Sequence, residues 1–276
     1  MIAAIFALAA VAPAPASCEV LDYGSWHESA AESWDFRWPS AGDPQLTIIG
    51  AEHVRDPAHP QFPKIAAAFA AANPTLVFFE GPDRGVRADA ETTIRETGES
   101  GYARFLASQA GLETRSLEPS PADQLRTLSA VFPPDQVLLF FTLREAARLR
   151  DREHKSGAAL DAAIAVLLTK AAAFAGPLGG ALPFRDVPGL SAAARSYWPN
   201  RDWRSLPGDW FSPTADDAKT GGLFLGAINR ADSTNRNRHM VAMLAAAVKS
   251  GARPFVVVGR NHVPMQAPAL RCALRS

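Results

Sequence analysis

Continuous apolar runs mark the strands that this sequence predicts. Three runs are strongly apolar and a fourth is weaker: Leu46–Ile49, Thr75–Phe79, Phe255–Val258 and Thr114–Leu117. Their positions do not alternate between apolar and polar, which favours strands buried on both faces. Because helical patterns separate the runs, we expect an α/β fold with a mostly parallel sheet of about four strands, flanked by helices.

The segments between and after these runs have the spacing and end signals of helices. The predicted helices are Phe62–Ala72, Tyr102–Ala110, Ala122–Ala130, Pro134–Glu153, Ala158–Ala175, Ser191–Tyr197 and Asp232–Ser250. Most of them fall between the third and fourth strands, so we expect a helical insertion at about residues 120–230 of a single domain. Residues 17–44 and Arg84–Glu99 contain few regular apolar positions, and we expect a loop-like lead-in and an exposed loop or lid there.

The first residues resemble a signal peptide. Ile2–Val11 is apolar but too short to span a bilayer, and Ala14-Pro15-Ala16 is a cleavage pattern. We therefore expect residues 1–16 to be removed, residues 17–276 to be exported to the periplasm or secreted, and no stable membrane anchor to remain. An uncleaved anchor or a misplaced start codon are the alternatives.

Charge and cysteine content limit the classes of partner and the cellular compartment that the sequence favours. The chain has 28 basic and 28 acidic residues, so its formal net charge is zero, and nothing indicates a nucleic-acid partner. Its two cysteines, Cys18 and Cys272, stand at opposite ends of the expected mature chain. In an oxidising compartment they could form one intramolecular disulfide, and two free thiols are the alternative.

Candidate chemistry gathers where the strands end. Two Gly-x-x-His motifs, Gly50–His53 and Gly259–His262, each follow an apolar run, and Glu80 directly follows another. Because parallel strands present their carboxyl ends at one edge of a sheet, we expect these side chains to meet there. Two imidazoles and a carboxylate are a ligand set of catalytic zinc and manganese sites, whose bound water can attack a carbonyl.

Several of these residues also have ordinary interpretations. Glu80 could form a salt bridge with Arg84 or Arg87, because a charge after a buried strand needs a partner or water. Glu52 is either a second carboxylate of the site or simply solvated. Glu118 is more typical of a loop residue at a strand end.

Two further positions are less clear from the residues alone. For Arg236 and Arg238, at the start of the last predicted helix, the sequence by itself favours surface positions. His59, in the loop after the first motif, is the best additional ligand.

The order of these motifs points to a family. The chain presents Gly50-x-x-His53, then Glu80, then Arg236-Asn237-x-x-Met240, then Gly259-x-x-His262. This order resembles the TraB/GumN/Tiki group, which is related to the erythromycin esterases and the ChaN-like haem-binding lipoproteins. The resemblance covers roughly Leu46–Glu80 and Asp232–His262. In one respect the chain departs from the esterase and ChaN branches, which tend to place Glu directly after the Gly, where this chain has Ala51.

The resemblance implies a helix-flanked parallel sheet whose cleft holds both histidines, the glutamate and the arginine. Tiki-type members look like metal-dependent proteases, whereas esterase-type members activate water with a His and acidic residues. Carried over, His53, Glu80 and His262 become metal ligands or acid–base groups, and Arg236 becomes an anion or oxyanion clamp.

The sequence therefore predicts an exported hydrolase that acts on a peptide or ester. Its catalytic candidates are Glu80, Arg236 and Glu52, and a divalent metal (Mn, Co or Zn) held by His53, Glu80 and His262 is the expected cofactor of a peptidase-like enzyme. The main alternative is a periplasmic haem or small-ligand binding protein that uses the same cleft, with His53 or His59 as an axial ligand. A family member that keeps only a structural role is a third.

Overall fold

The computed structural model describes residues 18–27, 34–39, 42–175 and 182–275. The expected signal peptide at residues 1–16 lies outside these ranges. Among the described residues, no helix combines the length and apolar character required to cross a membrane.

A five-stranded sheet forms the centre of the described structure, with strand order β1-β2-β5-β3-β4. Its strands are β1 Asp35–Trp38, β2 Leu46–Ala51, β3 Leu76–Phe79, β4 Thr114–Ser116 and β5 Pro254–Gly259. β2, β5, β3 and β4 run parallel, and β1 pairs antiparallel with β2. The predicted α/β class with a mostly parallel sheet is therefore confirmed.

The register of the central strands brings their ends together. Every residue of β3 and β5 is buried, as their continuous apolar runs predict. Ala51 of β2 lies opposite Gly259 of β5, and Phe79 of β3 lies opposite Val257. The residues that follow β2, β3 and β5 consequently emerge at the same edge of the sheet.

The lead-in is not entirely loop-like, because β1 forms the antiparallel edge of the sheet. Asp35 lies opposite Ile49 and Trp38 lies opposite Leu46. Only Phe36 of its four residues is buried. A strand with one buried side chain has too short an alternation to be recognised in the sequence.

The predicted exposed loop at Arg84–Glu99 is also partly wrong, since a helix begins inside it. Helix α3 spans Ala90–Gln109 and is capped by Asp89, whose carboxylate accepts the Thr92 backbone N–H at 2.7 Å. Its first turns bury Thr93 and Ile94, so the buried face is half polar. That is why the apolar pattern did not reveal it. Gly98 kinks the helix with φ +66°.

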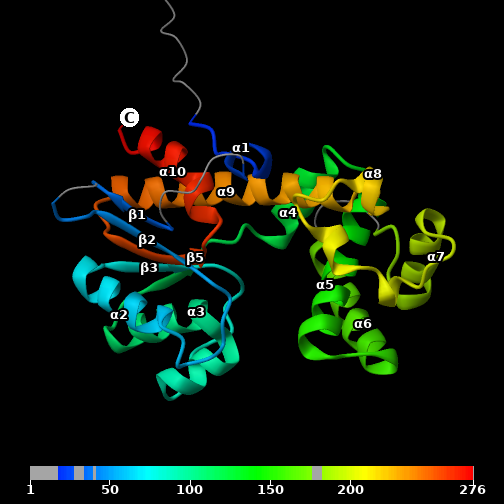
Figure 1. The fold of residues 1–276 in the computed structure, drawn as a ribbon, viewed down its shortest axis with the longest axis horizontal. Coiled ribbons are helices and arrows are strands. Elements are labelled where there is room, and N and C mark those ends of the chain that lie inside the picture. The colour runs from blue at the N-terminus through cyan, green and yellow to red at the C-terminus, as the bar shows by residue number, and fades with distance from the viewer. Residues whose placement is uncertain (1–17, 28–33, 40–41, 176–181, 276) are drawn as a thin grey trace, which may run out of the picture.

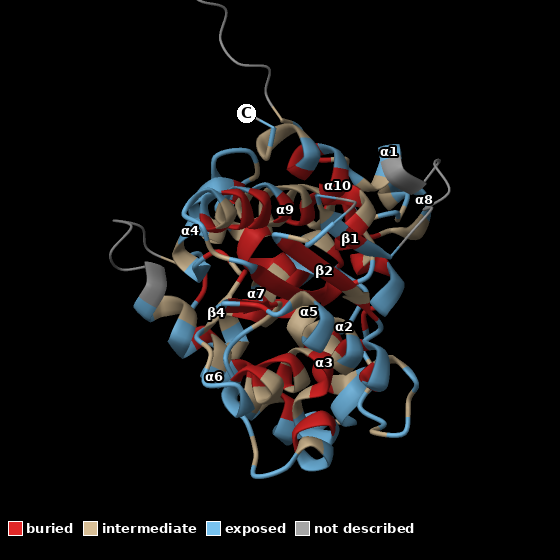
Figure 2. Cartoon of the chain, turned by 90° about the vertical axis from the view of Figure 1, so that its left-hand side faces the viewer, coloured by how far each residue is buried: buried red, intermediate tan, exposed pale blue. Residues whose placement is uncertain are grey.

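Helices cover both faces of the sheet (Figure 1). The remaining helices are α1 Tyr23–His27, α2 Gln61–Ala72, α4 Pro121–Ser129, α5 Pro134–Glu153, α6 Gly157–Ala175, α7 Val187–Tyr197, α8 Asp217–Thr220, α9 Leu225–Lys249 and α10 His262–Ala273. One apolar core joins the sheet to α9 and α10, and a second joins it to α2 and α3. Figure 2 shows the buried residues concentrated in the sheet and along the inner faces of α9 and α10.

A helical lobe stands beside the sheet. Helices α4 to α8 fall between β4 and β5 in the chain and stand to one side of the sheet, as Figure 1 shows. A separate apolar core of mostly lobe residues lies among these helices. Short 3-10 helices at Trp203–Ser205 and Gly208–Phe211 add aromatic side chains to this core. Helix α9 runs from the lobe to the sheet and contributes residues to both cores.

The two ends of the described chain lie together. Cys18 and Cys272 are within disulfide-bonding distance, with 5.5 Å between their Cα atoms and a sequence separation of 254. The Leu21 N–H also donates a hydrogen bond of 2.9 Å to the carbonyl of Met265 in α10.

Candidate functional site at the carboxyl edge of the sheet

Gly259 is the point where the predicted site residues converge. It ends β5, the strand between β2 and β3, so the residues after those two strands flank it. A methyl group placed on Gly259 would lie 3.1 Å from Glu80 Oε2 and 3.2 Å from His53 Nε2. The absence of a side chain at this glycine lets the carboxylate and the imidazole approach its backbone together.

Glu80 lies at the centre of the cluster. Its carboxylate accepts the Gly259 N–H at 2.6 Å and Arg236 Nη2 at 2.8 Å, and His262 Nε2 lies 3.3 Å from the same carboxylate. Burial alone would raise the pKa of Glu80, but His262, Arg236 and the Gly259 N–H together hold that pKa well below its usual 4.5. Glu80 is therefore ionised, and its cationic partner is Arg236 rather than Arg84 or Arg87.

Arg236 also binds a second carboxylate. Its Nε and Nη2 donate to the two oxygens of Glu118 at 2.8 and 2.5 Å, and Glu118 further accepts the Gly81 N–H at 3.2 Å. The Arg236 side chain is only 18% exposed. Burial lowers its pKa, but the charges of Glu80 and Glu118 raise it further than burial lowers it.

The predicted surface position of Arg236 is thus wrong, whereas that of Arg238, 55% exposed and paired with Glu19, is right. The reason is geometric, because a helix that leads into a parallel strand approaches from the carboxyl edge of the sheet. Glu118 does lie in the loop after β4, as predicted. It also belongs to the charge cluster formed by Glu80, Glu118 and Arg236.

His53 is oriented by a carboxylate that the sequence did not indicate. Its Nδ1–H donates to Glu99 Oε1 at 2.6 Å, so its Nε2 faces Gly259 and Glu80. Glu99 is 5% exposed. The hydrogen bond to Glu99 raises the pKa of His53 above 6.5, although burial acts in the opposite direction. Gly98, directly before Glu99, has φ +66°, a conformation that favours glycine, and a Cβ there would lie 3.3 Å from the Val54 carbonyl oxygen.

His262 is held in the same way by an amide. Its Nδ1–H donates to Asn237 Oδ1 at 2.7 Å, and that oxygen also accepts Gln266 Nε2 at 2.7 Å. His262 is the first residue of α10, and Asn237 is fully buried on α9. Both histidines therefore have an oxygen acceptor at Nδ1 and present Nε2 towards Glu80. The sequence placed Asn237 beside Arg236 but gave no sign of this role.

Glu52 lies outside this centre. It accepts Arg260 Nη1 at 2.6 Å, and both side chains are about half exposed. The pair links the two Gly-x-x-His loops, since the Arg260 N–H also donates to the Ala51 carbonyl at 2.9 Å. His59 lines a different cavity, between α2 and the β1–β2 edge.

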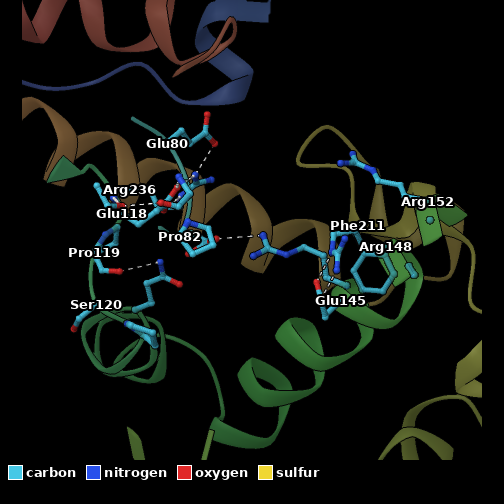
Figure 3. A pocket seen from close by; sticks show the side chains of 18 of the residues that line it. Glu80, Pro82, Glu118, Pro119, Ser120, Glu145, Arg148, Arg152, Phe211 and Arg236 are labelled. Carbon is cyan, nitrogen blue, oxygen red and sulfur yellow. Dashed lines mark hydrogen bonds and ion pairs between the residues drawn. The ribbon is translucent and has the colours of Figure 1, made fainter. Parts of the chain in front are cut away.

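Several cavities meet at this edge. A large one of about 830 Å³ lies between the strand ends and α5, and Figure 3 shows Glu80, Glu118 and Arg236 on one side with Glu145, Arg148 and Arg152 facing them. A second of about 370 Å³ is lined by Tyr23, Ala51, Glu52, His53, Gly259, Arg260, Asn261 and His262. A third of about 160 Å³ has His53, Glu80 and Glu99 among its walls.

The donor set has the chemistry of a metal site but is not gathered as one. Within the described ranges, no three His, Cys, Asp or Glu side chains are grouped so that they could hold a metal ion. Arg236 and the Gly259 N–H already bind the oxygens of Glu80. Metal and haem binding both stay predictions.

We compared the chain with protein-family models, curated proteins and solved structures, and none of them matches it. The resemblance to the TraB/GumN/Tiki group therefore stays a prediction based on the motifs.

Proposed function

We propose that this protein is a hydrolase that activates water with His53, Glu80 and His262 to cleave a peptide or ester bond. The observation that carries the proposal is the orientation of His53. Glu99 fixes its Nδ1–H at 2.6 Å, which leaves Nε2 as the basic nitrogen beside Glu80. A buried carboxylate behind an imidazole is the arrangement that orients a general base and stabilises its protonated form.

The steps follow from the positions of the protons. His53 Nε2 removes a proton from water, whose oxygen attacks the carbonyl carbon, and the carbonyl oxygen takes the negative charge. Arg236 supplies positive charge at the same edge, and its Nη1 takes part in none of its hydrogen bonds to Glu80 and Glu118. When the tetrahedral intermediate collapses, the proton on His53 passes to the leaving group.

His262 has a supporting role in this scheme. Its Nδ1 is hydrogen-bonded to Asn237, so its Nε2 faces Glu80 at 3.3 Å. We assign His262 as a positioning residue that keeps the Glu80 carboxylate in place beside His53.

The test is hydrolysis by the mature chain, residues 17–276, on a panel of peptide and aryl-ester substrates. A variant with His53→Ala and His262→Ala is expected to lose roughly 10²–10⁴-fold in rate, the usual contribution of general acid–base groups. His59→Ala is the matched control, because this histidine lines a separate cavity. Full activity in the double variant would reject the proposal.

A metal-dependent form of the same reaction is the second candidate. The observation in its favour is that both histidines have Nδ1 hydrogen-bonded to an oxygen, which is how metal-binding histidines are usually held. His53, Glu80 and His262 would hold the ion, and the ion would make its bound water more acidic. Metal analysis of purified protein decides between the forms. Stoichiometric metal that His53→Ala removes supports this candidate, whereas full activity without metal favours the metal-free route.

The same proposal places the enzyme in an oxidising compartment, either the periplasm or the medium. The closeness of Cys18 and Cys272 supports this placement, because disulfides persist mainly outside the cytosol.

A further inference from the structure

The N-terminal segment of the described chain is fixed to the helix that begins with His262. Cys18 is linked to Cys272 near the end of α10, and the Leu21 N–H donates to the carbonyl of Met265, the fourth residue of that helix. Between these points Val20 is buried in the core that α10 shares with the sheet. The segment therefore enters the molecule beside the catalytic edge, although it is distant from His262 in sequence.

Tyr23, two residues after Leu21, lines the cavity of about 370 Å³ whose walls include both histidines. The other walls of this cavity come from the two Gly-x-x-His loops, including the Glu52–Arg260 ion pair. Tyr23 is the single contribution from outside those loops among the described lining residues. One wall of this cavity of about 370 Å³ therefore depends on the N-terminal segment, which is attached to α10.

We infer that Tyr23 is a substrate-contacting residue of this cavity and that the Cys18–Cys272 link holds it there. The inference rests on the proposed function. It also narrows the substrate, because the walls carry a phenol, an ion pair, an amide and two imidazoles. Such a lining suits a polar part of the substrate with hydrogen-bonding groups, such as a stretch of peptide backbone, more than an acyl chain.

The reactivity of His262 towards a chemical reagent tests whether the disulfide holds Tyr23 in the cavity wall, and this test needs no substrate. The His262 side chain is 9% exposed and lines this cavity, so a reagent reaches it through the opening that Tyr23 borders. We expect reduction of the disulfide to raise the rate at which diethyl pyrocarbonate acylates His262 severalfold, as measured by peptide mapping. His59, in its separate cavity, is the internal control and should react at the same rate in both forms. Equal rates of His262 acylation before and after reduction would show that the disulfide does not hold Tyr23 in the cavity wall.

Substitutions at Tyr23 test the contact with substrate. Tyr23→Phe keeps the wall and removes the hydroxyl, whereas Tyr23→Ala removes both. We expect Tyr23→Ala to raise KM and to speed acylation of His262, and Tyr23→Phe to raise KM alone. Ser25→Ala is the matched control, because Ser25 is an exposed residue of the same short helix and does not line the cavity.

These experiments distinguish a failure of the role of Tyr23 from a failure of the proposed hydrolytic mechanism. If the variant lacking both histidines is fully active, the hydrolytic mechanism fails whatever Tyr23 does. If hydrolysis depends on the histidines but Tyr23→Ala changes neither KM nor the acylation of His262, the mechanism stands and this inference is wrong. Circular dichroism of each variant ensures that only folded proteins are compared.

Discussion

At the scale of single residues, the oxygen behind each histidine governs what that histidine can do. Glu99 behind His53 is a charge and Asn237 behind His262 is a neutral amide. A carboxylate stabilises the protonated imidazole much more than an amide does. The two Gly-x-x-His motifs look alike in sequence, but the two imidazoles are therefore suited to different tasks.

We predict that Glu99→Gln lowers the pKa of His53 from its raised value towards 6.5, measured by NMR titration of the imidazole. Because the folded-state pKa of His53 is raised, the stability that the His53–Glu99 pair contributes is fully present below about pH 6.5. That contribution is lost as the pH rises through the folded-state pKa of His53. The stability difference between the wild-type protein and the variant should follow that course, and the acidic limb of the activity profile should move to lower pH.

Glu96→Gln is the control for this prediction, since Glu96 lies on the same helix and pairs with Arg87 at the surface. An unchanged His53 titration in Glu99→Gln would show that Glu99 only packs beside the ring. A purely structural role would also leave the pH profile of activity unchanged.

The sequence could place His53, Glu80 and His262 because strand direction alone brings them to one edge. Glu80 directly follows an apolar run and each histidine comes four residues after one, and parallel strands fix where those runs end. Glu99 and Asn237 could not be found in this way. Their contacts depend on how far a helix is kinked or displaced against a loop, and no local spacing in the sequence encodes that distance.

At the scale of elements, the length of α9 explains the position of Arg236. The sequence predicted a helix from Asp232, but α9 begins at Leu225. Leu225 and Ile228 pack in the core of the helical lobe, whereas Met240 and Leu244 pack against the sheet. Arg236 lies between the two cores, where the helix passes the strand ends. The polar stretch from Asn229 to Arg236 concealed this part of the helix, since apolar periodicity is the main sequence signal.

We predict that Arg236→Met lowers the free energy of unfolding by about 3 kcal/mol or more, because it leaves two poorly exposed carboxylates without their cation. Chemical denaturation near neutral pH measures this loss. The folded-state pKa of Glu80 is lowered, so its contribution is present above its usual 4.5 and disappears as the pH falls through the folded-state value. The difference between the variant and the wild-type protein should therefore shrink in acid.

Arg238→Met provides the comparison on the same helix. Arg238 and its partner Glu19 are each more than half exposed, and such surface pairs contribute about 0–1 kcal/mol. If Arg236→Met cost no more than Arg238→Met, the charge cluster could not be what holds α9 at the strand ends.

At the scale of the whole molecule, the sheet and the helical lobe have separate cores that α9 joins. Residues from distant parts of the chain meet at the junction. Glu80 after β3, Arg236 on the connecting helix and Arg152 in the lobe all line the cavity of about 830 Å³. The sequence indicated the insertion from its run of helices. It could not indicate that the insertion would stand beside the carboxyl edge, because that depends on how the lobe packs.

Cys18 and Cys272, which lie within disulfide-bonding distance, are the basis of the final prediction. In the chain-entropy model, a cross-link across 254 residues restricts the unfolded chain enough to contribute up to about 5 kcal/mol. We expect Cys18→Ser with Cys272→Ser to lower the urea midpoint by a corresponding amount. The reduced wild-type protein should unfold at the same midpoint as the double variant, because both lack the same restriction. Val20 and Leu21 pack on α10 next to the two cysteines. We therefore expect this segment to unfold together with the rest of the structure, so that its release lowers the stability of the whole fold. An unchanged midpoint would instead mean that this segment separates from α10 before the sheet unfolds.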